Sequence, residues 1–220
     1  MKRLLPALAA AALVTALPGP ALSAATHHEA ASSAATSTTI AVKLADTKDA
    51  LRGLWFQHIF WVRNVVVARL DGDAAAAKAA EAEVVANAKA IAGAVEPFYG
   101  KAASDQLFTL LAGHWGAISA YVDATKAGSK AQESAAFAKL SSNANAIADF
   151  LAGANPHWPA ATLRGLLSAH GAHHVQQIQQ LHAGQYDAEA RTWAAMASHM
   201  NVIADALANG LAAQFPDKFR

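Results

Sequence analysis

The sequence contains no cysteine among its 220 residues. Disulfide bonds, thiol catalysis, cysteine-held iron–sulfur clusters and covalent attachment of haem or lipid are therefore excluded. Proline is scarce, with 7 residues, and few stretches are rich in β-branched residues. Because alanine is heavily used and is the strongest helix former, the composition favours an all-helical protein.

Neither sign of charge is in excess, since 17 Lys and Arg stand against 16 Asp and Glu. Proteins that bind nucleic acid usually carry a basic stripe, so the balanced charge argues against a nucleic-acid partner. Hydrophobic residues make up 54% of the chain and charged residues 15%. This apolar fraction is too high for a disordered protein and predicts one globular domain or two small ones.

The motifs of several enzyme classes are also missing. The chain has no Gly-x-Ser-x-Gly elbow, no phosphate-binding loop and no Gly-x-Gly-x-x-Gly. It has no Glu-x-x-His pair, which ferritin-like di-iron centres require. These absences favour a binding or structural protein over an enzyme, although an enzyme that uses an open position on a bound metal remains an alternative.

The first 24 residues have the pattern of a secretory signal peptide. Residues 1–3 supply positive charge, residues 4–17 form a short apolar run, and small residues precede a cleavage point after Ala24. A membrane anchor is the alternative, but the apolar run is shorter than the roughly 20 residues that cross a bilayer. We therefore expect an exported protein, periplasmic or secreted, with no membrane span after cleavage.

The rest of the chain is expected to have three parts. Residues 25–45 are rich in Ala, Ser and Thr and predict a flexible leader. Residues 46–216 predict a helical bundle domain, and residues 217–220 a tail. Within the domain, breakers that contain Gly or Pro separate six helical segments, expected at 46–70, 74–95, 104–127, 130–154, 159–184 and 187–214.

Short glycine turns join these segments into three antiparallel hairpins. Gly128 fits the position after a helix end, and Ser129 fits an N-cap whose capping box Gln132 closes. The hairpins repeat at a spacing of 56 residues. Five columns align: Leu51, Leu107 and Leu163; Leu54, Leu110 and Leu166; His58, His114 and His170; Gly72, Gly128 and Gly184; Ile91, Ile147 and Ile203. The predicted fold class is therefore all-α, a six-helix bundle built from three repeated antiparallel helical hairpins.

Each repeat places a histidine on the apolar face of its first helix. The two leucines and the histidine stand at i, i+3 and i+7, which share one face of a helix. The returning helix brings a polar residue to the same height as each histidine. The predicted pairs across the hairpins are His58 with Asn87, His114 with Asn143, and His170 with His199.

Three inward imidazoles on related hairpins predict a metal site. Neutral imidazoles suit Zn(II), Cu and Ni, and three histidines with an open fourth position form a familiar site. His199 is a candidate fourth ligand, and His174 lies one turn after His170. Asn87 and Asn143 are candidates to hold the second ring nitrogens. The sequence thus predicts one divalent transition metal, Zn or Cu, with the candidate ligands His58, His114, His170, His199 and His174.

Two other interpretations remain open at this point. Buried imidazoles need hydrogen bonds, and His–Asn pairs would supply them and specify one packing. The chain would then be a structural or interaction module of the cell envelope. An organic ligand or haem is the third interpretation, and the sequence identifies no protein partner.

Three charged residues outside these columns are assigned to solvent. Arg63 stands five residues after His58 and is interpreted as a solvated or capping arginine. Asp149 and Asp205 match by the 56-residue shift and are interpreted as solvated charges.

Four motifs in order along the chain resemble a family of exported bacterial helical proteins that has no established activity. The motifs are Leu54-Trp55-x-x-His58-x-x-Trp61-x-Arg63, Pro97-Phe98-Tyr99-Gly100, Asn155-Pro156-x-Trp158 and Gln214-Phe215-Pro216. The resemblance covers residues 46–216 and implies an exported helical bundle with histidines at positions 58, 114 and 170. Glutamine is common in the family pattern at the position of His199, and positions 173 and 174 are not histidine there. The resemblance therefore implies no family-wide role for His173, His174 or His199.

Overall fold

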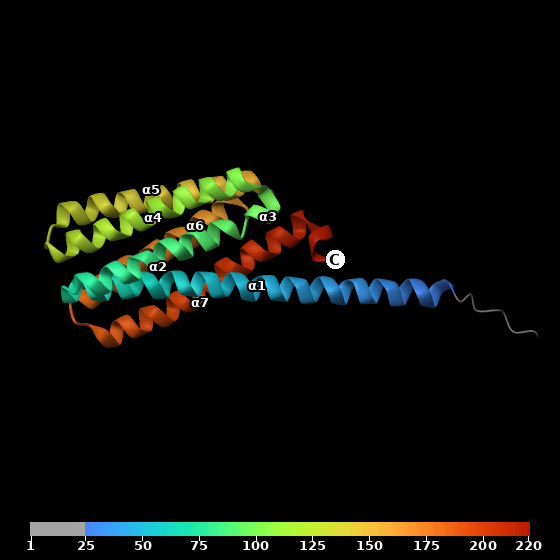
Figure 1. The fold of residues 1–220 in the computed structure, drawn as a ribbon, viewed down its shortest axis with the longest axis horizontal. Helices are drawn as coiled ribbons and strands as arrows, with labels where there is room; N and C mark the ends of the chain where they lie inside the picture. The colour runs from blue at the N-terminus through green and yellow to red at the C-terminus, as the bar shows by residue number, and fades with distance from the viewer. Residues whose placement is uncertain (1–24) are drawn as a thin grey trace, which may run out of the picture.

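The computed structural model describes residues 25–220, with side chains from residue 43 onward, so the signal peptide expected at residues 1–24 lies outside the described residues. The regular secondary structure of residues 25–220 consists of helices joined by short turns, without strands, which confirms the all-α class (Figure 1). The elements are α1 (Ala25–Asp71), α2 (Ala74–Gly93), α3 (Glu96–Tyr99), α4 (Lys101–Lys126), α5 (Lys130–Ala154), α6 (Ala160–His182), α7 (Tyr186–Gln214) and the 3-10 helix η1 (Pro216–Phe219).

The two ends of the described chain differ from the sequence expectation. The leader expected to be flexible at residues 25–45 is helical, because α1 begins at Ala25. Residues 25–45 contain neither glycine nor proline, so nothing interrupts an alanine-rich helix. Figure 1 shows this part of α1 projecting away from the other helices. At the other end, the tail forms η1 and buries Phe219 against α1 and α7.

The turns after α1, α4 and α6 share one backbone conformation. Gly72, Gly128 and Gly184 have φ of 81°, 65° and 67°, the left-handed region that favours glycine. Asp73 and Ser129 then cap the next helices, because their side chains accept hydrogen bonds from the backbone N–H groups three residues later. Each turn reverses the chain, so that α2 packs along α1, α5 along α4, and α7 along α6.

The hairpins also interlock with one another. α1 packs on α7, α4 on α2, and α6 on α5, so the first helix of each hairpin lies beside the second helix of another. The three first helices α1, α4 and α6 contact each other as well. This arrangement brings the face of each first helix that carries a repeated histidine toward the other two.

The hydrophobic core has two parts. The first core cluster contains Leu51, Leu107 and Leu163, and the second core cluster contains Val62 and Ile118. Along α1, α4 and α6 the repeated histidines come after first-cluster residues and before second-cluster residues. The histidines therefore occupy a polar layer between two apolar ones.

Among the helices that the structure describes, none combines the length and the hydropathy needed to cross a bilayer.

Candidate metal centre

Four histidine side chains meet in this polar layer. His58 comes from α1, His114 from α4, and His170 and His174 from successive turns of α6. Each offers one ring nitrogen, and the four nitrogens all lie within 4.8 Å of one another. Their exposed fractions are between 1% and 6%, so water has almost no access to them. We call these four residues the histidine cluster.

Two of the nitrogen–nitrogen distances already match those around a single ion. Nε2 of His170 lies 3.3 Å from Nε2 of His58 and 3.2 Å from Nε2 of His174. In a tetrahedral zinc site with Zn–N bonds of 2.0–2.1 Å, two ligand nitrogens are about 3.3 Å apart. The ring of His114 stacks nearly parallel to that of His170, with centroids 5.5 Å apart. The cluster thus has the dimensions of one ion-binding site.

The hydrogen bonds within the protein leave part of this cluster unsatisfied. Both ring nitrogens of His114 and Nδ1 of His170 are buried and have no hydrogen-bond partner. Buried polar atoms without a partner are rare in folded proteins, because each one loses its hydration without compensation. A cation at the centre of the cluster would take up one ring nitrogen of His114, whereas the other nitrogen of His114 and Nδ1 of His170 face away from that ion and need a different partner.

Burial keeps all four imidazoles neutral. Loss of hydration lowers the pKa of His58 to about 3 and that of His114 to about 4. Burial, and then the neighbouring imidazoles, lower the pKa values of His170 and His174 well below 6.5. A neutral imidazole has a free lone pair, which is the form that binds a metal. At pH 7 the cluster is therefore ready to act as a ligand set.

Trp55 covers the cluster on the side of the first core cluster. Its ring meets the rings of His58 and His170 edge-on, with centroid distances of 6.0 and 6.5 Å. The indole Nε1 of Trp55 is buried without a hydrogen-bond partner. On the other side, Val62 and Ile118 are fully buried. The site is therefore enclosed by hydrophobic side chains along the bundle.

His199 does not join the histidine cluster, contrary to the sequence prediction. Its Nε2 lies 2.8 Å from the carbonyl oxygen of Leu166, and its ring lies 5.4 Å from that of His173. The position of His199 along α7 is close to that of His170 along α6. The side chain of His199, however, is held by the carbonyl of Leu166, which lies one turn before His170 in α6. The predicted pairing of His170 with His199 is therefore wrong.

Asn87 and Asn143 make the same kind of contact. Their side-chain amides donate to the carbonyl oxygens of Leu54 and Leu110, each at 3.0 Å. Like the bond from His199, each contact spans 33 residues and reaches the carbonyl four residues before a repeated histidine. The amide oxygens of both asparagines are buried without partners.

The structure places the two asparagines differently with respect to the histidines. Asn143 lies close enough to His114 to raise its pKa against the effect of burial. Neither predicted His–Asn pair appears among the hydrogen bonds of the described residues, because the amides of Asn87 and Asn143 are engaged by the carbonyls of Leu54 and Leu110 instead.

The charged residues assigned to solvent form ion pairs between hairpins. Arg63 donates two hydrogen bonds to the buried Glu189, at 2.7 and 2.9 Å, and Gln177 donates a third to it at 2.8 Å. Asp205 accepts two from Arg52, at 2.9 and 2.8 Å.

Asp149 pairs with Arg164 in the same way. A signal for two of these pairs is present in the sequence, because Asp149 and Asp205 stand 56 residues apart, the spacing of the predicted repeat, and Arg52 and Arg164 stand at twice that spacing.

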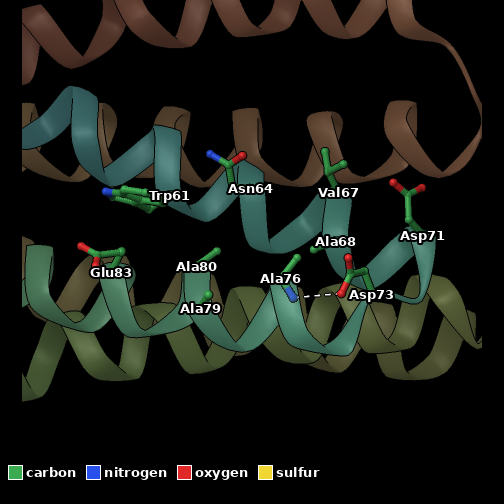
Figure 2. Close-up of a pocket in the computed structure, with 10 residues that line it drawn as sticks. All are labelled: Trp61, Asn64, Val67, Ala68, Asp71, Asp73, Ala76, Ala79, Ala80 and Glu83. Carbon is green, nitrogen blue, oxygen red and sulfur yellow. Dashed lines mark hydrogen bonds between the residues drawn. The ribbon is translucent and has the colours of Figure 1, made fainter.

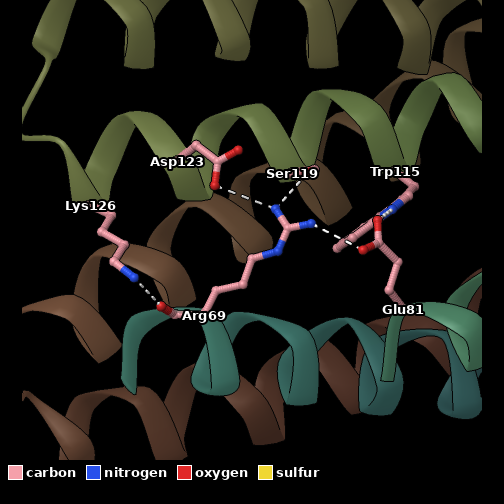
Figure 3. Close-up of polar contacts among 6 residues, drawn as sticks. All are labelled: Arg69, Glu81, Trp115, Ser119, Asp123 and Lys126. Carbon is pink, nitrogen blue, oxygen red and sulfur yellow. Dashed lines mark hydrogen bonds and ion pairs between the residues drawn. The ribbon is translucent and has the colours of Figure 1, made fainter. Parts of the chain in front are cut away.

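A separate polar network holds α1, α2 and α4 together near the first turn (Figure 3). Arg69 donates to Ser119 at 2.6 Å and to Glu81 at 3.3 Å, and Trp115 Nε1 donates to the same carboxylate at 2.9 Å. Lys126 donates to the backbone carbonyl of Arg69 at 2.6 Å. This network is structural and contains no histidine.

A shallow surface pocket of about 550 Å³ lies between α1 and α2 (Figure 2). Trp61, Asp71 and Glu83 line it, and so does Asp73, whose side chain caps α2. None of its lining residues belongs to the histidine cluster, so this pocket is not a route to the candidate site.

Comparison with known proteins gives no match to any family model, curated protein or solved structure. The function must therefore be argued from the site itself.

Proposed function

We propose that this protein binds one transition-metal ion through His58, His114, His170 and His174. The observation that carries the proposal is His114. Both of its ring nitrogens are buried and unpaired, and it belongs to a group of four imidazoles whose ligand atoms all lie within 4.8 Å of one another. A single cation at the centre would give every ring a partner at once.

Hydrogen bonds between the rings would satisfy fewer of the buried ring nitrogens than a metal ion would. A neutral imidazole has one N–H donor and one acceptor nitrogen. Nε2 of His170 faces both His58 and His174, and it has only one hydrogen or one lone pair to offer. Such sharing also leaves His114 without any bond. A metal ion therefore explains the cluster better than hydrogen bonding does.

The ligand set indicates which ions to expect. Imidazole nitrogen suits Zn, Cu and Ni, whereas Ca²⁺ and Mg²⁺ prefer oxygen. The 3.2 and 3.3 Å separations fit a tetrahedral ion, which favours Zn(II) over Cu(II) and Ni(II), since both of these prefer a square-planar arrangement of ligands. Four protein ligands in a buried site are typical of ions that are held rather than ions that catalyse. We therefore propose a metal-holding protein and not an enzyme.

The direct test is zinc stoichiometry by equilibrium dialysis of the untagged chain. We expect one zinc ion per chain, and a stoichiometry near zero when His114 and His170 are both replaced by glutamine. Replacing the exposed His157 and His182 by alanine is the matched control and should leave the ratio at one. Zinc binding that survives replacement of all four cluster histidines contradicts the proposal.

Cobalt(II) supplies a second readout, the geometry of the site. Tetrahedral Co(II) absorbs visible light much more strongly than six-coordinate Co(II), so loading should produce an intense band. The variant His27→Ala/His28→Ala removes two adjacent histidines within residues 25–45, whose imidazoles could bind a transition metal independently of the cluster. The band should persist in that variant and disappear in His114→Gln. Loss of the band in the first variant only would place the ion at residues 27–28.

One observation favours a purely structural function instead. The contacts of 3.2 and 3.3 Å between ring nitrogens are also ordinary hydrogen-bond lengths. In that case the cluster specifies packing, and the protein is a structural or interaction module of the cell envelope. This alternative predicts no bound metal at any zinc concentration.

We also propose that the three hairpins are copies of one unit with a period of 56 residues. The support is that the turn glycines share a conformation, and that three side-chain bonds to a leucine carbonyl each span 33 residues. Export is proposed from residues 1–24 alone. Expression with the native N-terminus in a Gram-negative host, followed by intact-mass measurement, should show removal of those residues.

A further inference from the structure

A narrow apolar cavity lies beside the histidine cluster, within the first core cluster. Its volume is about 30 Å³. Hydrophobic side chains form its whole wall, among them Leu51, Leu107, Ile147, Leu207 and the two tryptophans Trp55 and Trp158. Ala94 and Val95, at the end of α2, are the partly exposed members of the wall.

The size and lining of the cavity restrict what it can hold. A cavity needs roughly 10–15 Å³ of such volume for one water molecule, so there is room for a ligand of about two water-sized atoms. Cavities lined by Leu, Ile and aromatic rings stay dry, because water there would lose its hydrogen bonds, and they take up small apolar molecules instead. The cavity is thus too apolar for water and too small for a sugar or a nucleotide.

Trp55 is the wall residue that contacts both the cavity and the histidine cluster. Its ring lines the cavity and also meets His58 and His170 edge-on. Trp158, the other tryptophan of the wall, donates its Nε1 hydrogen to the carbonyl of Leu207 at 3.3 Å and makes no ring contact with the cluster among the described residues. Trp55 is therefore the residue that lies between an occupant of the cavity and the histidine cluster.

We propose that this cavity binds a small uncharged, apolar molecule of two or three heavy atoms, of which dioxygen is the simplest. Trp55 forms the partition between this ligand and the histidine cluster. The proposal goes beyond metal binding and does not depend on it, because none of the residues that line the cavity belongs to the histidine cluster.

Dissolved dioxygen tests the proposal directly, since it is paramagnetic and speeds the relaxation of nuclei near it. The metal-free full chain is studied by methyl NMR under increasing oxygen pressure. We expect the relaxation enhancement at Leu107 and Ile147 to exceed, several-fold, that at Ile118 and Val122. These controls are fully buried, whereas Leu107 and Ile147 are 4% and 3% exposed, and they lie in the second core cluster. Equal enhancement at both sets of methyl groups overturns the proposal.

Two variants of the cavity wall sharpen the result. Leu107→Phe fills the cavity and should reduce the enhancement at Ile147 to the level of Ile118. Because the larger ring can disturb packing, Leu207→Ala provides the opposite change and should increase the enhancement at Ile147. If Leu107→Phe remains folded and the enhancement at Ile147 is unchanged, or if Leu207→Ala lowers it, oxygen enters elsewhere and the proposal is wrong.

Discussion

At the scale of single residues, the four imidazoles are the most consequential groups in the chain. They are buried, neutral and only partly hydrogen-bonded. The pKa of an unfolded histidine is near 6.5, whereas burial lowers that of His58 to about 3 and that of His114 to about 4 in the folded protein. This difference links the stability of the metal-free protein to pH.

The sign of that link follows from proton uptake. Below pH 6.5 the unfolded chain binds protons at these histidines while the folded chain does not, so acid favours unfolding. The unfolding free energy carries no penalty from these histidines above pH 6.5, and it decreases as the pH falls from 6.5 toward about 3. We predict that His114→Gln reduces the loss of unfolding free energy between pH 7 and pH 5 by about 2 kcal/mol. Urea unfolding in the presence of a chelator measures the unfolding free energy at each pH. The prediction is contradicted if His114→Gln leaves the dependence of the unfolding free energy on pH unchanged, and His157→Ala is the control.

Asn143→Ala tests the bond between an asparagine and a leucine carbonyl. The carbonyl of Leu110 keeps its helical hydrogen bond when the amide is removed, so no buried acceptor is left without any partner. We predict a loss of about 1 kcal/mol in unfolding free energy, the ordinary value of one hydrogen bond. Asn87→Ala should cost about the same, because its contact has the same length of 3.0 Å. A loss above roughly 3 kcal/mol would mean that the amide does more than bond to this carbonyl.

The sequence predicts the histidine cluster well and its surroundings poorly. Spacing on an apolar face identified His58, His114 and His170, and helix periodicity added His174. The position of a residue along the bundle does not determine the direction in which its side chain points. The prediction that His199 joins the cluster is wrong for this reason. The partners of Arg63 and Asp205 lie in other hairpins, and such contacts depend on how the hairpins dock, which local patterns do not encode.

At the scale of helices, the short-range signals predict most boundaries. The turn glycines and the caps of α2 and α5 are visible in the sequence, and α5 has the expected bounds. α1 begins earlier than the sequence predicts, because the Ser and Thr content of residues 25–45 suggests flexibility although this stretch contains no glycine or proline. Long-range contacts between helices are the part that local reasoning leaves undetermined.

The pair of Arg63 with Glu189 is predicted to be the main polar link between α1 and α7. Only 4% of the Glu189 side chain is exposed, so Arg63→Ala would leave a buried carboxylate without its charged partner. We predict a loss of about 2–3 kcal/mol in unfolding free energy. Arg52→Ala is the matched control, because Arg52 and Asp205 are both about one-third exposed, and solvent screening makes such pairs contribute much less than a buried one. Equal losses in urea unfolding of the two variants would refute this ranking.

Gly210 in α7 is predicted to be required for the packing of Trp158. A Cβ atom at position 210 would lie 2.0 Å from Nε1 of Trp158, far inside contact distance. Gly210→Ala should therefore displace the indole, break its bond to Leu207 and lower the unfolding free energy by about 2–3 kcal/mol. Gly165→Ala in α6 meets nothing within 4 Å and should stabilise the protein by up to about 1 kcal/mol, since alanine is the better helix former. Thermal unfolding should show a lower midpoint for Gly210→Ala and an equal or higher midpoint for Gly165→Ala than for the unmodified chain.

At the scale of the whole molecule, three hairpins contribute to a single site. α1, α4 and α6 each supply at least one of the four histidines, so an ion bound there joins all three hairpins. Because the unfolded chain has no such site, binding should stabilise the folded state as a whole.

We predict that zinc at 100 times its dissociation constant raises the unfolding free energy by about 2.7 kcal/mol. The thermal midpoint should rise accordingly, and a chelator should reverse the shift. The variant His114→Gln/His170→Gln should show no zinc-dependent shift, whereas His182→Ala should behave like the unmodified chain. Calorimetry with and without zinc measures all three, and an equal shift in the double variant would show that zinc acts elsewhere.

The polar layer between the two core clusters also limits how the hairpins can slide. One turn of an alanine-rich helix resembles the next, so packing alone discriminates weakly between alignments that differ by about 5.4 Å. Sliding α4 by one turn would place the imidazole of His114 against leucine or isoleucine side chains and separate it from the other rings. That misalignment would strand polar nitrogens in hydrocarbon, at a cost of about 1–3 kcal/mol for each one. The same four side chains that can hold an ion thereby select one alignment out of several near-equivalent ones.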